Sequence, residues 1–542
     1  MKNFLTRLPI TLLTLLALAL PAFAGPLDDY YLNAFSAQPI GSTQKKSALL
    51  QTSVTGERAV CGTPLKHGLS RDWNKLEAAT QKVLAKQLAA PVLSGDETTQ
   101  MTLLSNSGRF RIHYTTSGID AVPSLGWVQT VAQTFDDVAA AYSAHGWRLA
   151  PTVSASPYDV YLRELSSQRL YGQTTSVLAI PSAGYDNAFG SYMELDNNFT
   201  DSIYVNSGGG TFSALQSLQV TAAHEYHHAI QYGYNYYFDI WYAEATATWM
   251  EDELYDSVNQ LYTYLPAWFN NSTQSLDSAT STSIGGGYGR WIFNRYQAEQ
   301  HGVDTVRAAW EKLSGIARPA DGSDIIMLPI LESLIMTSYS SSLGSDVFGF
   351  ARRVYTGAWG SGDVSHPQDI SLIHPYSPTA TLSSYPANSS IALDHYSFAF
   401  YKFTPSATES TLSLALNKNS GIATSLFKNA GGTVSEIAAN SNGSYTVPGF
   451  SSLNTGDEVV LLVVNTTNVD NRKVSFSTNG SAAVISIPGD CDDDGTVTIA
   501  EAQSAINMFL GLNAILGCVD VDGSGGVSIA EVQKVINSFL GL

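Results

Sequence analysis

Residues 213–233 read SALQSLQVTAAHEYHHAIQYG. Ser213, with a Gln three residues later, matches the capping box that opens many helices, so the stretch is predicted to be helical. Residues four apart on a helix share a face and lie one turn apart. His224 and His228 can therefore face a single cation, with Glu225 beside them.

Two neutral imidazoles on one helix face suit Zn²⁺, which in catalytic sites usually keeps three protein ligands and one water. With 10 histidines in the chain, a His-Glu-x-x-His pattern would arise by chance on the order of once in a hundred such sequences. The alternative is a surface helix with scattered His and Glu. The third ligand is predicted to be Glu244, set among small and aromatic residues in 241–251, WYAEATATWME. Asp239 is the competing ligand and could also cap that helix, whereas a merely solvated Glu244 is the simpler alternative.

The segment 105–380 resembles the zincin peptidases, specifically the thermolysin-like gluzincin branch, in which two His and one Glu hold zinc. The metzincin pattern does not fit, because it requires Gly and His where this chain has Gln231 and Tyr234. The resemblance implies an α+β zincin catalytic domain and a zinc metalloendopeptidase acting on proteins or peptides. Zinc would activate a water, Glu225 would be the general base, and Tyr288 is one candidate for stabilising the oxyanion.

Strand and helix patterns alternate in this segment. Apolar residues at three- and four-residue steps predict a helix over 128–142, with Gly146 as its stop, and Gly233 is suitable just past the end of the histidine helix. Strands are predicted at 110–114, 158–162, 191–195 and 203–205. The strand 191–195 resembles the edge strand that zincins pair with an extended substrate, although it could equally be an ordinary edge strand. The segment 288–302 resembles a helix of the second zincin subdomain and is expected in the core.

After about residue 378 the helical periods give way to short alternating runs separated by Asn, Gly and Ser, which predicts a β-sandwich over 381–483. The last part, 488–542, repeats itself at an offset of 30 residues. Each repeat holds an EF-hand-type loop, with oxygen ligands at positions 1, 3, 5, 7, 9 and 12, followed by a helix. The predicted ligands of two Ca²⁺ ions are Asp490, Asp492, Asp494, Thr496, Thr498 and Glu501 in the first loop, and Asp520, Asp522, Ser524, Gly526, Ser528 and Glu531 in the second.

Two loop–helix units without a preceding helix resemble dockerin type I modules. The resemblance implies a small α-helical, calcium-dependent domain and a cohesin-type partner. Two acidic turns without metal are the alternative. A bridge between Cys491 and Cys518 would tie the two loops together, which leaves Cys61 as the odd one of three cysteines.

The start of the chain resembles a secretory signal over 1–24, with Lys2 and Arg7 before an apolar run and a small-residue cleavage site. We therefore expect a secreted protein, extracellular or associated with a cell surface. Residues 25–104 are loop-rich and are interpreted either as a removable pro-segment or as an N-terminal wrap. The formal net charge of -19 argues against nucleic acid as a partner, and no segment beyond the signal suits a membrane span.

The predicted function is thus extracellular, zinc-dependent peptide hydrolysis. One rival is a catalytically silent zincin-like adhesion or scaffold component that acts through its sandwich and dockerin-like domains. Another is a zinc hydrolase with a non-peptide substrate. Hydrolytic activity distinguishes the first rival from the enzyme, because a silent protein could still bind metal.

Overall fold

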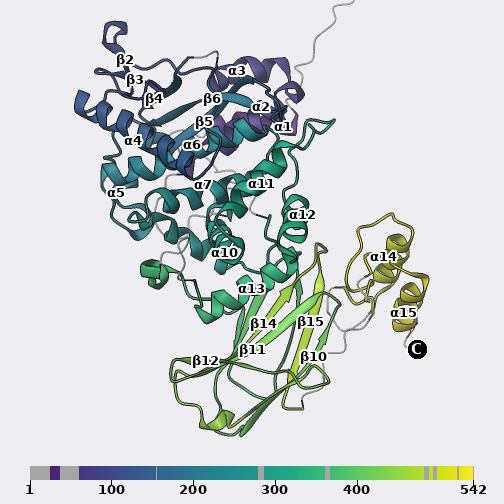
Figure 1. Ribbon diagram of the computed structural model, residues 1–542. Coiled ribbons are helices and arrows are strands. Elements are labelled where there is room, and N and C mark those ends of the chain that lie inside the picture. The colour runs from purple at the N-terminus through teal and green to yellow at the C-terminus, as the bar shows by residue number, and fades with distance from the viewer. Residues whose placement is uncertain are drawn as a thin grey trace, which may run out of the picture.

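The computed structural model describes residues 25–36, 60–153, 156–278, 286–360, 367–480, 488–491, 497–521 and 524–540. These residues form a multidomain structure of mixed helices and three β-sheets, consistent with an α+β part followed by a β-sandwich (Figure 1). The expected signal segment 1–24 lies outside them. No helix among the described residues is both long and apolar enough to cross a bilayer.

A six-stranded sheet forms the framework of the first part, in the order β1-β5-β6-β4-β3-β2 (Figure 1). β3, β4 and β6 run parallel, whereas β5 is antiparallel to β6 and β2 is antiparallel to β3. Two of the strands, β1 and β2, lie before residue 105, so the sheet takes strands from both sides of the expected boundary. The six strands are β1 (Val60–Cys61), β2 (Gln100–Leu104), β3 (Phe110–Thr115), β4 (Tyr158–Arg163), β5 (Leu170–Ala179) and β6 (Phe189–Asp196).

Two long helices, α4 (Leu125–Ala144) and α6 (Ala214–Tyr234), pack against this sheet and against each other. Alternation in β3 and β4 buries every second side chain completely, as the sequence pattern predicted. The helix expected over 128–142 is also confirmed, and Gly146 follows it with a positive φ of 76° that glycine adopts without strain.

Three local predictions are wrong. The strand 191–195 lies in β6, which is flanked by β5 and β4, so it is an interior strand and not the edge strand. Residues 203–205 belong to a short helix, α5 (Ser202–Val205). Gly233 lies inside α6, where a Cβ would meet Pro151 Cδ at 2.6 Å, so close packing rather than helix termination requires glycine there.

A helical layer connects the first sheet to the rest of the molecule. Within 288–302, residues 288–289 and 291–301 are helical and residues 288–298 are buried, as predicted for a core segment; Gly302, with a φ of 105°, follows the helix. The helices of this layer are α7 (Ile240–Leu254), α8 (Leu265–Phe269), α9 (Gly286–Gly289), α10 (Trp291–His301), α11 (Asp304–Ser314), α12 (Leu328–Tyr339) and α13 (Leu343–Thr356).

Two antiparallel sheets follow the helical layer. One has the order β13-β10-β15-β8 and the other β12-β11-β14-β9-β7. Every residue of β14 is buried, because one face joins the core shared by the two sheets and the other packs toward α13. The strands are β7 (Ala380–Leu382), β8 (Asn388–Leu393), β9 (Phe398–Phe403), β10 (Thr411–Lys418), β11 (Ile422–Ala430), β12 (Thr433–Ile437), β13 (Tyr445–Pro448), β14 (Glu458–Asn465) and β15 (Arg472–Thr478).

The repeated tail contributes two helices, α14 (Ile499–Phe509) and α15 (Ile529–Leu540), which pack together beside the sandwich (Figure 1). The predicted disulfide between Cys491 and Cys518 is confirmed, and Cys61 is free and buried. The bridge joins the start of the first repeat to the start of the second across 27 residues.

The N-terminal residues form α1 (Pro26–Ser36), α2 (Thr63–Asp72) and α3 (Ala78–Leu88). These helices share a small core of their own, including Tyr31, Leu69 and Leu84. In addition, α2 packs against β5, and the short β1 that precedes it pairs with β5 in parallel. The N-terminal region is therefore attached to the sheet edge nearest to α6.

Candidate metal centre

α6 holds its histidines in the interior of the protein. Its first turn is fixed by the predicted capping box: Ser213 Oγ accepts from the Gln216 N–H at 3.2 Å, and Gln216 Oε1 accepts from the Ser213 N–H at 2.9 Å. From Val220 onward every residue of the helix is buried. Its histidines therefore meet other protein groups rather than bulk water.

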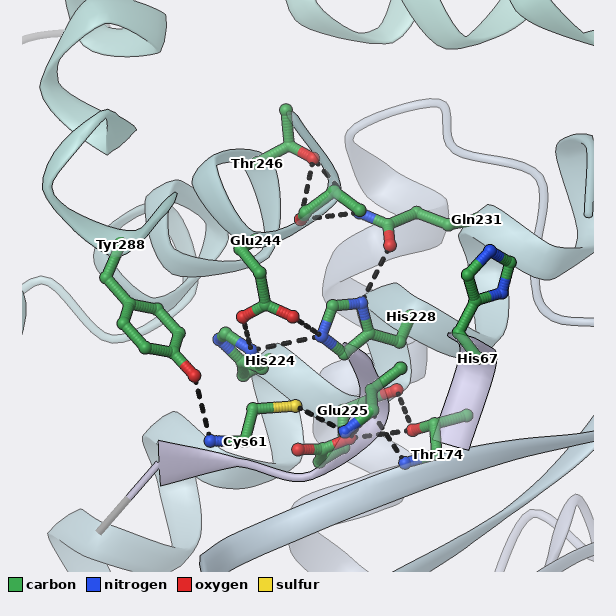
Figure 2. A network of polar contacts seen from close by, with 12 residues as sticks. Cys61, His67, Thr174, His224, Glu225, His228, Gln231, Glu244, Thr246 and Tyr288 are labelled. Carbon is green, nitrogen blue, oxygen red and sulfur yellow. Dashed lines mark hydrogen bonds and ion pairs between the residues drawn. The ribbon is translucent and has the colours of Figure 1, made fainter. Parts of the chain in front are cut away.

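Three predicted zinc ligands converge on one point. The Nε2 atoms of His224 and His228 lie 3.1 Å apart. Each faces a different oxygen of Glu244 on α7, at 3.3 Å for His224 and 3.2 Å for His228 (Figure 2). Donors bound at about 2.0–2.2 Å in a tetrahedral zinc site are separated by about 3.3 Å. The spacing of this metal triad, His224, His228 and Glu244, therefore fits a zinc ion.

The other ring nitrogen of each histidine is anchored. His228 Nδ1 lies 2.7 Å from Gln231 Oε1, and Gln231 Nε2 donates to Ala243 O at 2.9 Å, which fixes the orientation of the amide. His224 Nδ1 lies 2.8 Å from Glu251 Oε1. Both partners accept hydrogen bonds, so each Nδ1 carries the proton and each Nε2 of a neutral ring presents a lone pair. Second partners of this kind orient metal-ligating histidines.

The triad needs a positive charge at its centre. Neither Glu244 oxygen receives a hydrogen bond among the described residues, although the side chain is 1 % exposed. Burial opposes ionisation of Glu244, but positive charge on the facing His228 and His224 rings outweighs burial and lowers the pKa of the carboxyl to about 2. A buried carboxylate facing two ring nitrogens is costly unless a proton or a cation lies between them. The donor set is one that zinc accepts.

Asp239, the competing ligand, lies elsewhere. It occupies the position before α7, but its carboxylate does not cap that helix; Asp239 Oδ2 accepts from Trp241 Nε1 at 3.0 Å and from the Met327 N–H at 3.1 Å. Burial raises its pKa to about 7. The sequence interpretation missed Glu251, which lies seven residues after Glu244 and therefore on the same face of α7; that spacing is the signal that could have identified it.

Glu225 lies beside the triad, between α6 and β5. Its Oε2 accepts from Thr63 Oγ1 at 3.0 Å and lies 2.8 Å from Thr174 Oγ1. Gly172 of β5 permits this approach, since a Cβ there would meet Glu225 Cγ at 2.9 Å and Thr221 Cγ2 at 3.0 Å. The carboxylate is thus buried and held by hydroxyl groups.

Tyr288, the oxyanion candidate, lies on α9 beside the triad, with its ring centroid 6.0 Å from that of His224 (Figure 2). Burial raises its pKa well above the usual value, so the phenol remains protonated. Its hydroxyl accepts from the Cys61 N–H at 2.9 Å. His224, Glu225, Tyr288 and Cys61 line a cavity of about 20 Å³, room for little more than one water molecule.

Cys61 is the functional candidate that the sequence interpretation left without a role. Its sulfur belongs to a group of four donors, with the metal triad, whose atoms all lie within 4.8 Å of one another. Cys61 is far from α6 in the sequence, so no short residue spacing indicates that the two are close. The pairing of β1 with β5 brings Cys61 to the triad. His227, by contrast, packs among Tyr142, Trp147 and Trp310.

Eight of the twelve predicted calcium ligands lie within the described residues. Asp492, Asp494, Thr496 and Asp522 lie outside them. Asp520 accepts from the N–H groups of Ser524 and Gly525, each at 3.0 Å, and Gly525 has a φ of 78°. Glu501 Oε1 accepts from the Cys491 N–H at 2.7 Å, which closes the first loop.

Four predicted calcium ligands, Glu501 among them, form helix caps. Thr498 and Glu501 make a capping box at the start of α14. Glu531 Oε2 accepts from the Ser528 N–H at 2.8 Å at the start of α15. Asp490 and Gly526 are the remaining predicted ligands among the described residues. Asp490, like Asp520, is buried.

Comparisons with known proteins add no family assignment: no family model matches the chain, and none of the curated proteins does. The candidate site is therefore defined by its own geometry. A second group of carboxylates, Asp252, Asp256 and Asp369, also lies close enough together to hold an ion.

Proposed function

We propose that the chain is a secreted zinc metallopeptidase of the gluzincin type, which hydrolyses protein or peptide substrates. The observation that carries this proposal is the metal triad itself. Two Nε2 lone pairs and a buried carboxylate converge within 3.3 Å, and both rings are anchored at Nδ1. A carboxylate that is no member of the triad, Glu225, adjoins it.

The roles of the protein groups follow from their positions. Bound zinc would act as a Lewis acid toward water and a substrate carbonyl. Glu225, held between Thr63 and Thr174, would accept a proton and return it to the leaving amine. Tyr288 remains protonated and can donate a hydrogen bond to a developing oxyanion. These are the acid–base and charge-stabilising groups that amide hydrolysis needs.

The tail is proposed to be a dockerin-like module that binds two calcium ions and a cohesin-type partner. The repeated loop–helix units, the backbone donors around Asp520 and the position-12 glutamates support it. Such a module would place the enzyme in an extracellular or cell-surface setting.

A second function remains a candidate because of one observation. Structural zinc sites are closed by four protein ligands, whereas catalytic sites keep one position open. Cys61 supplies a fourth donor. A permanently closed centre would favour a catalytically silent zincin-like adhesion or scaffold component.

Hydrolysis of a broad peptide library by the zinc-loaded protein tests the proposal. Since Cys61 lies within the donor group, the assay uses both the intact chain and a Cys61→Ser variant. In the form that cleaves peptides, Glu225→Gln should abolish cleavage while stoichiometric zinc is retained. Glu97→Gln is the matched control, because Glu97 is exposed and distant in sequence from α6. Absence of cleavage by both forms would contradict the peptidase proposal.

A further inference from the structure

Two residues of one short N-terminal segment, Cys61 and Thr63, contact each kind of group in the proposed hydrolytic site. Cys61 Sγ lies within 4.8 Å of the donor atoms of the metal triad. The Cys61 N–H donates to Tyr288 OH at 2.9 Å (Figure 2). Thr63 Oγ1 donates to Glu225 Oε2 at 3.0 Å. The metal-binding, oxyanion-stabilising and proton-accepting groups are therefore all engaged by one short segment of the chain.

The chemistry of Cys61 suits a metal ligand. Its side chain is 7 % exposed, and the other two cysteines are joined in a disulfide, so it is the only thiol in the chain. Thiolate is a strong ligand for zinc, alongside imidazole and carboxylate. The Thr63 N–H donates to the sulfur at 3.3 Å, so the side chain is held in place beside the triad. Both oxygens of Glu244 face the same space without a hydrogen bond among the described residues.

The backbone of this segment occupies the edge of β5, which would otherwise be free to pair with an extended peptide. β1 pairs with β5, and the Gly62 N–H donates to Gly172 O at 2.9 Å. Main-chain pairing with an exposed strand edge is a common way for proteins to hold peptides. A Cβ at position 62 would meet Gln173 Oε1 at 2.5 Å and its Cβ at 2.9 Å, so glycine allows the close approach.

The helix after this segment anchors it. On α2, His67 is fully buried, stacks on Phe238 with ring centroids 4.5 Å apart and contacts Asp324 through Nε2 at 3.1 Å. Arg71 also pairs with Asp324. The segment that places Cys61 beside the triad thus has its own contacts to the rest of the protein. The cavity that remains there has room for little more than one water molecule.

We propose that Cys61 is the fourth donor to the metal held by His224, His228 and Glu244, and that residues 60–63 thereby keep the hydrolytic site closed in the intact chain. The ligation requires that the thiol release its proton to solvent as the metal binds, with no oxidation or reduction. The closing role rests on the proposed peptidase function, whereas the ligation does not. Activation then requires removal of this segment from the triad.

The first test uses the intact wild-type chain loaded with zinc and measures X-ray absorption at the zinc edge. Zinc–sulfur contacts lie at about 2.3 Å, longer than the roughly 2.0–2.2 Å of nitrogen and oxygen ligands. One sulfur neighbour per zinc is expected in wild type and none in Cys61→Ser. A wild-type centre with only nitrogen and oxygen neighbours would overturn the proposal and leave the peptidase proposal intact.

The second test measures peptide hydrolysis at equal zinc content. Cys61→Ser should cleave at least about tenfold faster than wild type, because the fourth position becomes available to water. The matched control is the pair Cys491→Ser and Cys518→Ser, which makes the same chemical change away from the triad and should leave the wild-type rate low. If Cys61→Ser does not fold, titration of the wild-type thiol with an organomercurial should raise hydrolysis in proportion to the thiol consumed.

The outcomes separate the two proposals. A sulfur neighbour together with faster hydrolysis by the opened form supports both. A sulfur neighbour without hydrolysis by any form would retain the ligation, contradict the peptidase and identify a structural zinc site. Equal hydrolysis by wild type and the opened form would contradict closure while supporting the peptidase.

Discussion

Gln231 Oε1 lies 2.7 Å from Nδ1 of His228, one helical turn away on α6. The same side chain donates to Ala243 O on α7 at 2.9 Å. It therefore fixes the ring of one proposed ligand and joins the helix of the histidines to the helix of Glu244. A residue that touches no metal would in this way determine how well the triad binds one.

Replacing Gln231 should consequently weaken zinc binding. Gln231→Leu removes the acceptor for His228 Nδ1, and loss of such outer partners typically costs 10- to 100-fold in metal affinity. Gln231→Glu keeps an acceptor at that place and should recover most of the affinity. Competition with a chromophoric chelator measures the dissociation constants. Equal affinities for wild type and Gln231→Leu would show that the contact does not orient the ring.

Glu244 and Asp239 provide a matched pair for the identity of the third ligand. Glu244→Gln should lower zinc affinity by at least about tenfold, since the amide loses the charge that faces both Nε2 atoms. Asp239→Asn should leave the affinity near that of wild type, because its carboxylate bonds to Trp241 and the Met327 N–H. Competition with the chromophoric chelator measures the zinc affinity of both variants. A larger loss of affinity in Asp239→Asn than in Glu244→Gln would identify Asp239 as the third ligand.

The sequence was sufficient where the signal was local. His224 and His228 share a face because they are four residues apart, and the capping box of α6 and the alternation of β3 follow from equally short spacings. The approach of Glu244 to the two histidines was predictable from its small neighbours, which allow α7 to pack closely on α6. The paired cysteines of the tail were predictable because both belong to one repeated unit.

Other features depend on contacts between distant residues. β5 was missed because it carries Gln173, Thr174, Thr175 and Ser176 rather than alternating apolar residues; these side chains are buried all the same, and Thr174 and Gln173 bond to Glu225 and Glu194. Without β5, the strand now seen as β6 looked like the edge. The position of Cys61 follows from pairing with that unpredicted strand.

Gly172 should be intolerant of a side chain. In Gly172→Ala the new Cβ would lie 2.9 Å from Glu225 Cγ, so β5 and α6 must separate, at a cost of roughly 1–3 kcal/mol in the free energy of unfolding. Hydrolysis should also fall, because Glu225 is displaced. Gly126→Ala is the control, since its nearest heavy atom would be 3.6 Å away. Urea unfolding of both variants checks the expectation, and equal stability would contradict it.

The disulfide of the tail should stabilise the two loop–helix units. It joins Cys491 to Cys518 across 27 residues, and the lower chain entropy of the cross-linked unfolded state corresponds to a stabilisation of roughly 3–4 kcal/mol. Reduction, or Cys518→Ser, should therefore speed hydrogen exchange in α14 and α15 while leaving α6 unchanged. Mass-resolved exchange measures both regions. Exchange in α14 that is unaffected by reduction would show that calcium or packing alone holds the pair.

His395 should make the contact between the first part and the sandwich sensitive to pH. Its Nε2 lies 2.8 Å from Asp277 and its Nδ1 2.5 Å from Asp470. Burial alone would lower the pKa of His395, but the hydrogen bonds to Asp277 and Asp470 raise it to about 9. Because the folded value lies above the unfolded one of about 6.5, the stabilisation is complete below pH about 6.5 and is lost as pH rises through 9.

The measurement that follows is the difference in unfolding free energy between wild type and His395→Gln. At pH 6 the variant should be less stable by about 1 kcal/mol, a value reduced for solvent screening because Asp470 is half exposed. The difference should shrink toward zero by pH 10, where the wild-type imidazole is neutral and can donate only one of its two hydrogen bonds. A difference that stays constant from pH 6 to pH 10 would mean that His395 stabilises this contact by packing rather than by charge.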